Sequence, residues 1–125
     1  MIVVDAMNVR GCVPDGWWRD PDGALRTLVA AIAGHDWTDD EWVVVIADGR
    51  PVADLPAGTR GRVELRYAGH SAPDAADDEI VALVGTLDPD DGAARVVTSD
   101  RGLIRRLPGW VAVEGAATFR RRLGR

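Results

Sequence analysis

The opening residues constrain this chain more than any other stretch. Residues 1–4 are apolar without alternation, and the run ends on the carboxylate of Asp5 and, three residues later, on the carboxamide of Asn8. Such a run is typical of a central strand that is buried on both faces of a parallel sheet. In open α/β sheets, ligands bind where the carboxyl ends of the strands meet, because the loops diverge there. We therefore expect Asp5 to border a binding site.

Three later segments carry acids in comparable places. Asp48 and Asp100 each follow an apolar run. Asp77 and Asp78 lie in the first turn of an expected helix. In a parallel sheet these acids would converge on the edge where Asp5 lies. Any one of them could serve only as a helix cap, as Asp100 could for a helix that begins at residue 101, but their convergence favours a functional site.

Strands and helices alternate along the chain. Asp20 with Pro21 is a typical helix start, and Ser71 with Asp74 has the spacing of a capping box. We expect strands at 1–5, 42–48, 63–68 (an edge strand), 95–98 and 110–114, helices at 21–34, 71–87, 101–107 and 115–123, and loops at 9–20 and 49–62. This order predicts a single domain, residues 1–125, with an α/β fold: a three-layer α/β/α sandwich around a mostly parallel central sheet.

Composition excludes several classes of protein. A single cysteine, Cys12, rules out an intrachain disulfide. A zinc site would need other ligands, and His35 and His70 are isolated in the sequence. The apolar stretches are far shorter than the roughly 20 residues that span a bilayer, and no leader segment is recognisable. We therefore expect a cytoplasmic protein that does not bind membranes.

The net charge of −5 is unevenly distributed. Residues 95–125 carry eight arginines and two acids, whereas residues 1–94 carry seven arginines and eighteen acids. The basic segment could simply be a solvated helix face. An anionic pocket beside arginines is also what an enzyme that cleaves phosphodiesters would need, because arginine grips phosphate with two donors.

The phase of the expected helix at 71–87 separates its two neighbouring acids. Its apolar stripe consists of Ala76, Ile80, Leu83, Val84 and Leu87. This stripe places Asp77 at the border of the buried face and Asp78 nearly opposite it. Carboxylate and carboxamide oxygens are the ligands that Mg²⁺ and Mn²⁺ prefer. We therefore expect Asp77 to reach a metal site more directly than Asp78.

The same residues resemble a known family. Asp5-Ala-Met-Asn8 after an apolar strand resembles the Asp-Gly-x-Asn opening of NYN domains in the PIN-like nuclease superfamily, with Ala6 in place of the usual glycine. Ala76-Asp-Asp-Glu-Ile-Val81 is similar to their Asp-Asp-x-x-Ile-Val helix start, and Thr98-Ser-Asp100 to their Ser-(Asn)-Asp strand end. Ala47-Asp-Gly-Arg50 looks like the Phe-Asp-Gly segment of bacterial YacP-type members.

The resemblance implies a PIN-like fold and a metal-dependent endoribonuclease, a hydrolase that cleaves RNA with a water activated by Mg²⁺ or Mn²⁺ and leaves a 3′-hydroxyl and a 5′-phosphate. It implies that the catalytic residues are Asp5, Asp77 and Asp100, that Asn8 and Asp78 join them around the metal, and that Asp48 and Ser99 support the site.

The loop at 9–20 lies outside the family pattern. Trp17 and Trp18 could stack on unpaired bases, and Arg10, Arg19 and Arg50 could bind phosphates. We expect one of the two indoles to pack against the protein and the other to be exposed. The remaining tryptophans, which we expect to pack in the core or at the sheet edge, are Trp37, Trp42 and Trp110.

Two other functions stay open on the sequence. The same acids could serve a nucleotide phosphohydrolase, although the chain has no Gly-rich phosphate loop of the Walker type. A non-catalytic RNA- or protein-binding module is the second, although clustered negative charge would repel RNA. A homodimer or a protein partner is compatible with either.

Overall fold

A six-stranded sheet forms the centre of the computed structural model, which describes residues 1–69 and 74–124. The strand order is β3-β4-β2-β1-β5-β6, and every pair is parallel except the antiparallel pair of β3 and β4. The strands are β1 (Ile2–Asp5), β2 (Val43–Ala47), β3 (Gly58–Arg60), β4 (Val63–Tyr67), β5 (Arg95–Val97) and β6 (Ala112–Glu114). The predicted α/β fold with a mostly parallel sheet is confirmed.

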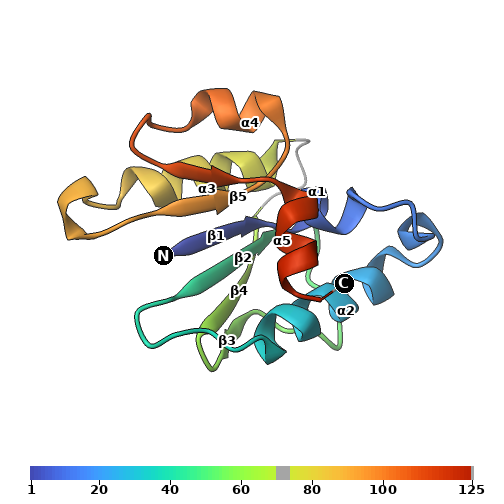
Figure 1. Cartoon of the computed structure of the whole chain (residues 1–125). Helices are drawn as coiled ribbons and strands as arrows, with labels where there is room; N and C mark the ends of the chain where they lie inside the picture. Colours follow the sequence, from blue (N-terminus) through green and yellow to red (C-terminus); the bar gives the residue numbers. More distant parts are fainter. Residues whose placement is uncertain (70–73, 125) are drawn as a thin grey trace.

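Helices cover both faces of this sheet (Figure 1). The helices are α1 (Ala6–Gly11), α2 (Pro21–Gly34), α3 (Ala75–Gly85), α4 (Arg101–Arg106) and α5 (Ala116–Arg122), with 3₁₀ turns η1 (Trp17–Arg19) and η2 (Pro89–Asp91). Buried side chains of α1, α2 and α5 share one apolar cluster, and those of α3 and α4 share the other. The molecule therefore has the three layers that the sequence predicts.

The strand β1 is central because its side chains feed both clusters. Ile2 and Val4 point into the cluster under α2, and Val3 points into the cluster under α3. All four residues of β1 are buried, including Asp5 at its end. The apolar run that opens the sequence therefore brings a carboxylate to the middle of the sheet edge.

Helix α2 begins where the sequence predicts. The side chain of Asp20 accepts a hydrogen bond from Gly23 N at 3.0 Å. A Cβ atom at position 23 would lie 2.2 Å from Asp20 Oδ2, so this cap needs a glycine there. Helix α2 then buries Leu25, Leu28, Val29 and Ile32 against the sheet.

Three local expectations are wrong. The segment 63–68 is not an edge strand, because residues 58–60 form β3 on its outer side. The loop expected after Asn8 instead begins as helix α1 and contains the turn η1. Trp110 is 37% exposed, although Trp37 and Trp42 pack against the two apolar clusters. The capping box expected of Ser71 with Asp74 depends on Ser71, which lies outside the described residues, as does His70.

In the part of the chain that the structure describes, no helix is both long enough and apolar enough to cross a bilayer.

Candidate active site

The carboxylate of Asp5 lies at the end of β1 and is only 4% exposed. Thr98 Oγ1 donates a hydrogen bond to Asp5 Oδ2 at 2.9 Å. The pKa of Asp5 is raised to about 6, mainly by burial and also by the charges of Asp77 and Asp100, while the Thr98 hydroxyl opposes the shift. These influences show that three of the predicted acids act on one another at this edge of the sheet.

The fully buried Thr98 links two of these acids. Its hydroxyl donates to Asp5 and also accepts a hydrogen bond from Asp100 N at 3.1 Å. Thr98 was not among the predicted site residues. The signal that could have found it is a hydroxyl at the end of an apolar strand, directly before an acid, because a buried hydroxyl needs a polar partner.

Asp100 begins helix α4. Its Oδ1 accepts hydrogen bonds from Gly102 N at 2.8 Å and Leu103 N at 3.3 Å. The capping role that the sequence allowed for Asp100 is therefore present. Among the described residues, its Oδ2 accepts no hydrogen bond and is free for another ligand.

Helix α3 presents its two acids differently. Asp77 is half-buried and its pKa is raised, mainly by burial and then by the charges of Asp100, Asp74 and Asp48. Asp78 is exposed, and its Oδ1 lies 2.8 Å from Arg106 NH2 of helix α4. These positions agree with the phase of the apolar stripe. Asp78 ties α3 to α4 and does not point toward Asp5 with its neighbour.

The remaining predicted polar residues brace the loops around these acids. Asn8 Oδ1 accepts a hydrogen bond from Ser99 N at 2.7 Å, and Ser99 Oγ accepts one from Ala116 N at 2.9 Å. Asp48 Oδ1 accepts one from Ala76 N at 2.8 Å. These bonds join the ends of β1, β2 and β5 to the starts of α3 and α5. The supporting positions predicted for Asp48 and Ser99 agree with these contacts, and a metal-binding role for Asn8 stays a prediction.

Carboxylate oxygens are the ligands that a hard divalent ion prefers, but the acids at this edge do not surround a common point. In the described ranges 1–69 and 74–124, no group of three His, Cys, Asp or Glu side chains is arranged to hold a metal ion. The carboxylates of Asp5, Asp77 and Asp100 are near enough for their charges to act on one another. Mg²⁺ typically keeps several waters and binds through one or two carboxylates, so an open site at this edge would need only part of this set.

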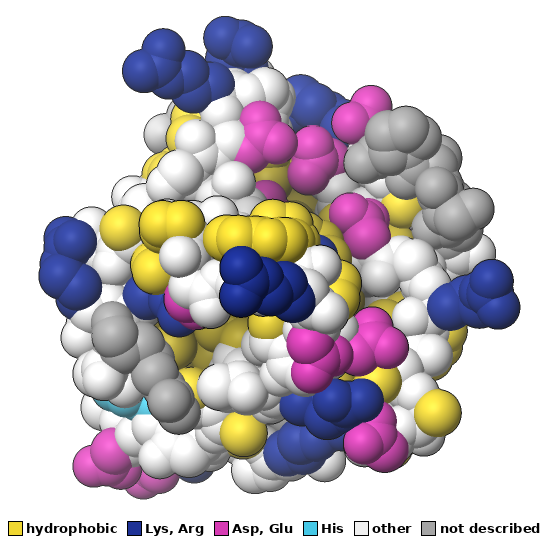
Figure 2. Space-filling view, turned by 90° about the vertical axis from the view of Figure 1, so that its right-hand side faces the viewer, with side chains coloured by type: hydrophobic (Ala, Val, Ile, Leu, Met, Phe, Trp, Pro, Cys, Tyr) yellow, Lys and Arg dark blue, Asp and Glu magenta, His cyan; other side chains and the backbone are white. Residues whose placement is uncertain are grey.

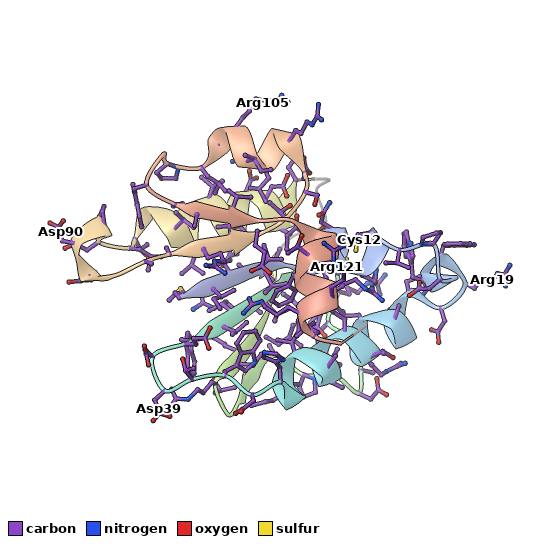
Figure 3. The ribbon with its side chains drawn as sticks, in the orientation of Figure 1. Cys12, Arg19, Asp39, Asp90, Arg105 and Arg121 are labelled. Carbon is purple, nitrogen blue, oxygen red and sulfur yellow. The ribbon has the colours of Figure 1, made fainter. Side chains whose placement is uncertain are left out.

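The tryptophan loop has one packed and one exposed indole, as predicted. Trp17 is half-buried, with the guanidinium of Arg10 at 4.8 Å from its ring centroid. Trp18 is 52% exposed, and Arg19 lies 6.0 Å from its ring centroid. Figure 3 shows Arg19 at the outer end of this loop, pointing into solvent.

Arg50 and the arginines of the basic C-terminal segment differ in whether they pair with acidic side chains. Arg50 is exposed after the end of β2. In the basic C-terminal segment, Arg95 and Arg122 both pair with Glu114, and Arg106 pairs with Asp78. Arg105 points outward from α4 in Figure 3. The positive charge of this segment is therefore partly neutralised within the protein.

The face toward which the parallel strands run is shown in Figure 2. Acidic side chains lie in its upper part and again at the lower right, and arginine side chains lie around and between them. A face that carries both charges suits a ligand that brings both a metal ion and phosphates.

Comparisons with known proteins agree with this architecture. The structure is similar to that of Rae1 (YacP) from Bacillus subtilis, with a TM-score of 0.72, 22% sequence identity, and coverage of 99% of this chain and 73% of that chain. A tryptophan-to-leucine mutant of the same protein gives a TM-score of 0.76 at 22% identity, covering 98% of this chain and 74% of that chain. This chain has the YacP fold. No protein-family model matches the sequence, and no curated protein does.

Proposed function

We propose that this protein is a metal-dependent endoribonuclease that hydrolyses RNA phosphodiester bonds with Mg²⁺ or Mn²⁺. The observation that carries the proposal is the buried carboxylate of Asp5 at the centre of the sheet edge, close enough to Asp77 and Asp100 for their charges to raise its pKa. Perturbed carboxylates gathered in one place are typical of catalytic sites. The YacP fold and the motifs that resemble PIN-like nucleases support the same conclusion.

Asp5, Asp77 and Asp100 are the residues that would hold the ion. When bound, Mg²⁺ or Mn²⁺ would polarise the scissile phosphate and make a water molecule more acidic. Thr98 fixes the direction of the Asp5 carboxylate, and the α4 backbone fixes that of Asp100. Both acids are therefore oriented before the ion arrives, which lowers the cost of assembling the site.

RNA would be bound by residues around this centre. Arg10 and Arg50 would bind backbone phosphates, and the exposed ring of Trp18 would stack on an unpaired base, which is worth about 1–3 kcal/mol per base. Asp78 would act indirectly, because its pair with Arg106 holds α3 against α4. Two of the predicted ligands, Asn8 and Asp78, therefore have structural partners that would limit direct contact with the ion.

The test is to incubate the purified protein with single-stranded RNA, structured RNA and nucleoside triphosphates, each in Mn²⁺, Mg²⁺ or EDTA. We expect internal cleavage of RNA in either ion and none in EDTA. Release of phosphate from nucleoside triphosphates without RNA cleavage would replace the proposal with a phosphohydrolase. RNA binding without any cleavage would replace it with a binding module.

A further inference from the structure

A hollow lies beside the acidic edge, between the tryptophan loop, α2 and α5. Its volume is about 230 Å³. One wall is the ring of Trp17, and small residues of α2 form the floor, namely Ala24, Thr27 and Ala31. Arg10 and Arg120 also line it. Two carboxylates line it as well: Asp15, which accepts a hydrogen bond from Arg120, and Asp20, which accepts one from Gly23 N. The hollow thus combines an aromatic ring, small side chains, two guanidinium groups and two carboxylates that already have partners.

Both arginines keep unused hydrogen-bond donors. Arg10 NH1 donates to Pro21 O at 3.3 Å. Arg120 donates from NH1 to Val9 O and from NH2 to Asp15 Oδ2, each at 3.3 Å. Arg10 Nε and Arg120 Nε are the buried side-chain polar atoms without a hydrogen-bond partner in the described part of the chain. A guanidinium has five donors, so these bonds, all near the long limit, leave most of its capacity unfilled.

The unsatisfied donors point to an anionic ligand. A buried donor without an acceptor costs free energy, so such groups need an explanation, and a missing ion or ligand is a common one. In this protein both orphan donors belong to the two arginines that line one hollow. Their Nε atoms are closed to solvent, so a ligand in the hollow would meet the terminal nitrogens, and Arg10 NH2 makes no hydrogen bond among the described residues. An anion between them would offset the cost of burying two positive groups, and arginine is well suited to phosphate.

The hollow lies next to the acidic edge. Arg10 belongs to α1, the helix that follows Asp5 and also contains Asn8. Burial lowers the pKa of Arg10, and the charges of Asp22 and then of Asp48, at the end of β2, oppose that shift. An RNA strand with one nucleotide in the hollow could therefore continue toward the acidic site.

We infer that this hollow binds one unpaired nucleotide of the RNA, with its phosphate between Arg10 and Arg120 and its base against Trp17 and the floor of α2. The inference rests on the proposed ribonuclease function. A volume of about 230 Å³ is smaller than the roughly 300 Å³ at which pockets for drug-sized ligands begin. The hollow can therefore take the base, with the phosphate at its rim beside the two guanidinium groups. A base must be unpaired and unstacked to lie against Trp17, so the substrate would be single-stranded at this position.

The test uses two variants that alter the hollow by different means. Ala24→Leu fills the floor without removing a hydrogen bond, and Arg120→Gln removes the charge. The matched control is Ala30→Leu, on the exposed side of the same helix and outside the hollow. Binding of a fluorescein-labelled single-stranded RNA octamer is measured in EDTA, so that cleavage does not interfere, and cleavage of the same RNA is measured in Mn²⁺. Thermal melts establish that each variant is folded.

We expect Ala24→Leu and Arg120→Gln each to weaken RNA binding by about 10-fold or more, within the roughly 5- to 150-fold that one stacked base contributes. Ala30→Leu should bind as the unmodified protein does. A nucleoside monophosphate should also displace the RNA at a lower concentration than inorganic phosphate. Undiminished binding by folded Ala24→Leu, or equal competition by inorganic phosphate, would overturn the nucleotide site.

The two proposals fail in different ways. If RNA is cleaved in Mn²⁺ while Ala24→Leu binds normally, the ribonuclease stands and the nucleotide site is wrong. If binding depends on the hollow but no RNA is cleaved in Mn²⁺ or Mg²⁺, the nucleotide site stands and the ribonuclease is wrong.

Discussion

Both ends of the parallel strands carry acidic residues, but the pKa of a carboxyl group is lowered at the amino end and raised at the carboxyl end. At the amino end, Glu41 accepts hydrogen bonds from Thr38 N at 2.9 Å and Thr38 Oγ1 at 3.0 Å, and these bonds lower its pKa. At the carboxyl end, burial raises the pKa of Asp5 to about 6. Figure 3 shows Asp39 and Asp90 at the amino end, far from the end where Arg19 lies.

The difference shows that acidic content alone does not mark a site. The amino end even has the larger hollow, about 650 Å³, and four acids border it: Asp40, Glu41, Asp88 and Asp91. Asp40, Asp88 and Asp91 are exposed to water, which screens their charges. At the carboxyl end the strands hold Asp5 out of water beside other acids, so its negative charge is costly unless a cation arrives.

The largest effect that we expect comes from removing the buried charge at the carboxyl end. Asp5→Asn should lower metal-dependent RNA cleavage by more than about 100-fold, beyond the range typical for an outer partner of a metal ligand. The matched control is Asp40→Asn at the amino end, which should cleave normally. Cleavage rates at saturating Mn²⁺ measure the effect. Comparable losses in both variants would mean that the two ends are not functionally different.

Within the carboxyl end, we expect unequal losses from the two acids of α3. Asp77→Ala should approach the loss of Asp5→Asn. Asp78→Ala should cost only about 10- to 100-fold, because it acts through its pair with Arg106. Arg106→Gln breaks the same pair and should match Asp78→Ala. A titration of cleavage rate against Mn²⁺ for all three variants tests this, and an inactive Asp78→Ala beside an active Asp77→Ala would show that Asp78 is the direct ligand.

The raised pKa of Asp5 predicts how stability changes with pH when no metal is bound. The group ionises at 3.8 in its ordinary state and at about 6 in the folded protein. Its contribution is therefore fully present below pH 3.8 and is lost as the pH rises through 6, by up to about 3 kcal/mol for two pKa units. Denaturant titrations in EDTA from pH 4 to 7.5 should show this loss, and Asp5→Asn should lack it. An identical pH profile for the two proteins would contradict the burial of a charged Asp5.

The smallest effect is expected at the amino end, with the opposite pH dependence. The pKa of Glu41 is lowered, so its contribution is present above its ordinary value of 4.5 and is lost as the pH falls through the folded value. Glu41→Gln should therefore lower the free energy of unfolding at pH 7 by less than about 1 kcal/mol, because the group is partly exposed. At pH 3 the two proteins should be equally stable. A larger deficit at pH 3 than at pH 7 would reverse this assignment.

The sequence predicts the parts of this site that depend on local pattern. The apolar run before Asp5 identifies the central strand, and the alternation of strands and helices brings the acids to one edge. The stripe of apolar residues on α3 correctly separates Asp77 from Asp78. Each of these inferences needs only the residues within one element and the rules of parallel sheets.

The contacts that the sequence does not predict join distant elements. Residues 58–60 form β3 only because β4 offers them an antiparallel partner, so their own composition gives little sign of a strand. The pair of Asp78 with Arg106 and the place of Arg120 beside Arg10 likewise depend on how helices pack. The sequence shows that the C-terminal segment is basic. It does not show which of its arginines pair with acids and which line the hollow.

The hydroxyl of Thr98 bonds both Asp5 and Asp100, which lie far apart in the sequence. A change at any of these three positions therefore alters the setting of the other two. Their mutational effects should not add, because neighbours in one hydrogen-bond network are coupled. Since one hydroxyl orients the Asp5 carboxylate and also accepts the backbone N–H of Asp100, a substitution of Thr98 should disturb two elements of the sheet edge at once.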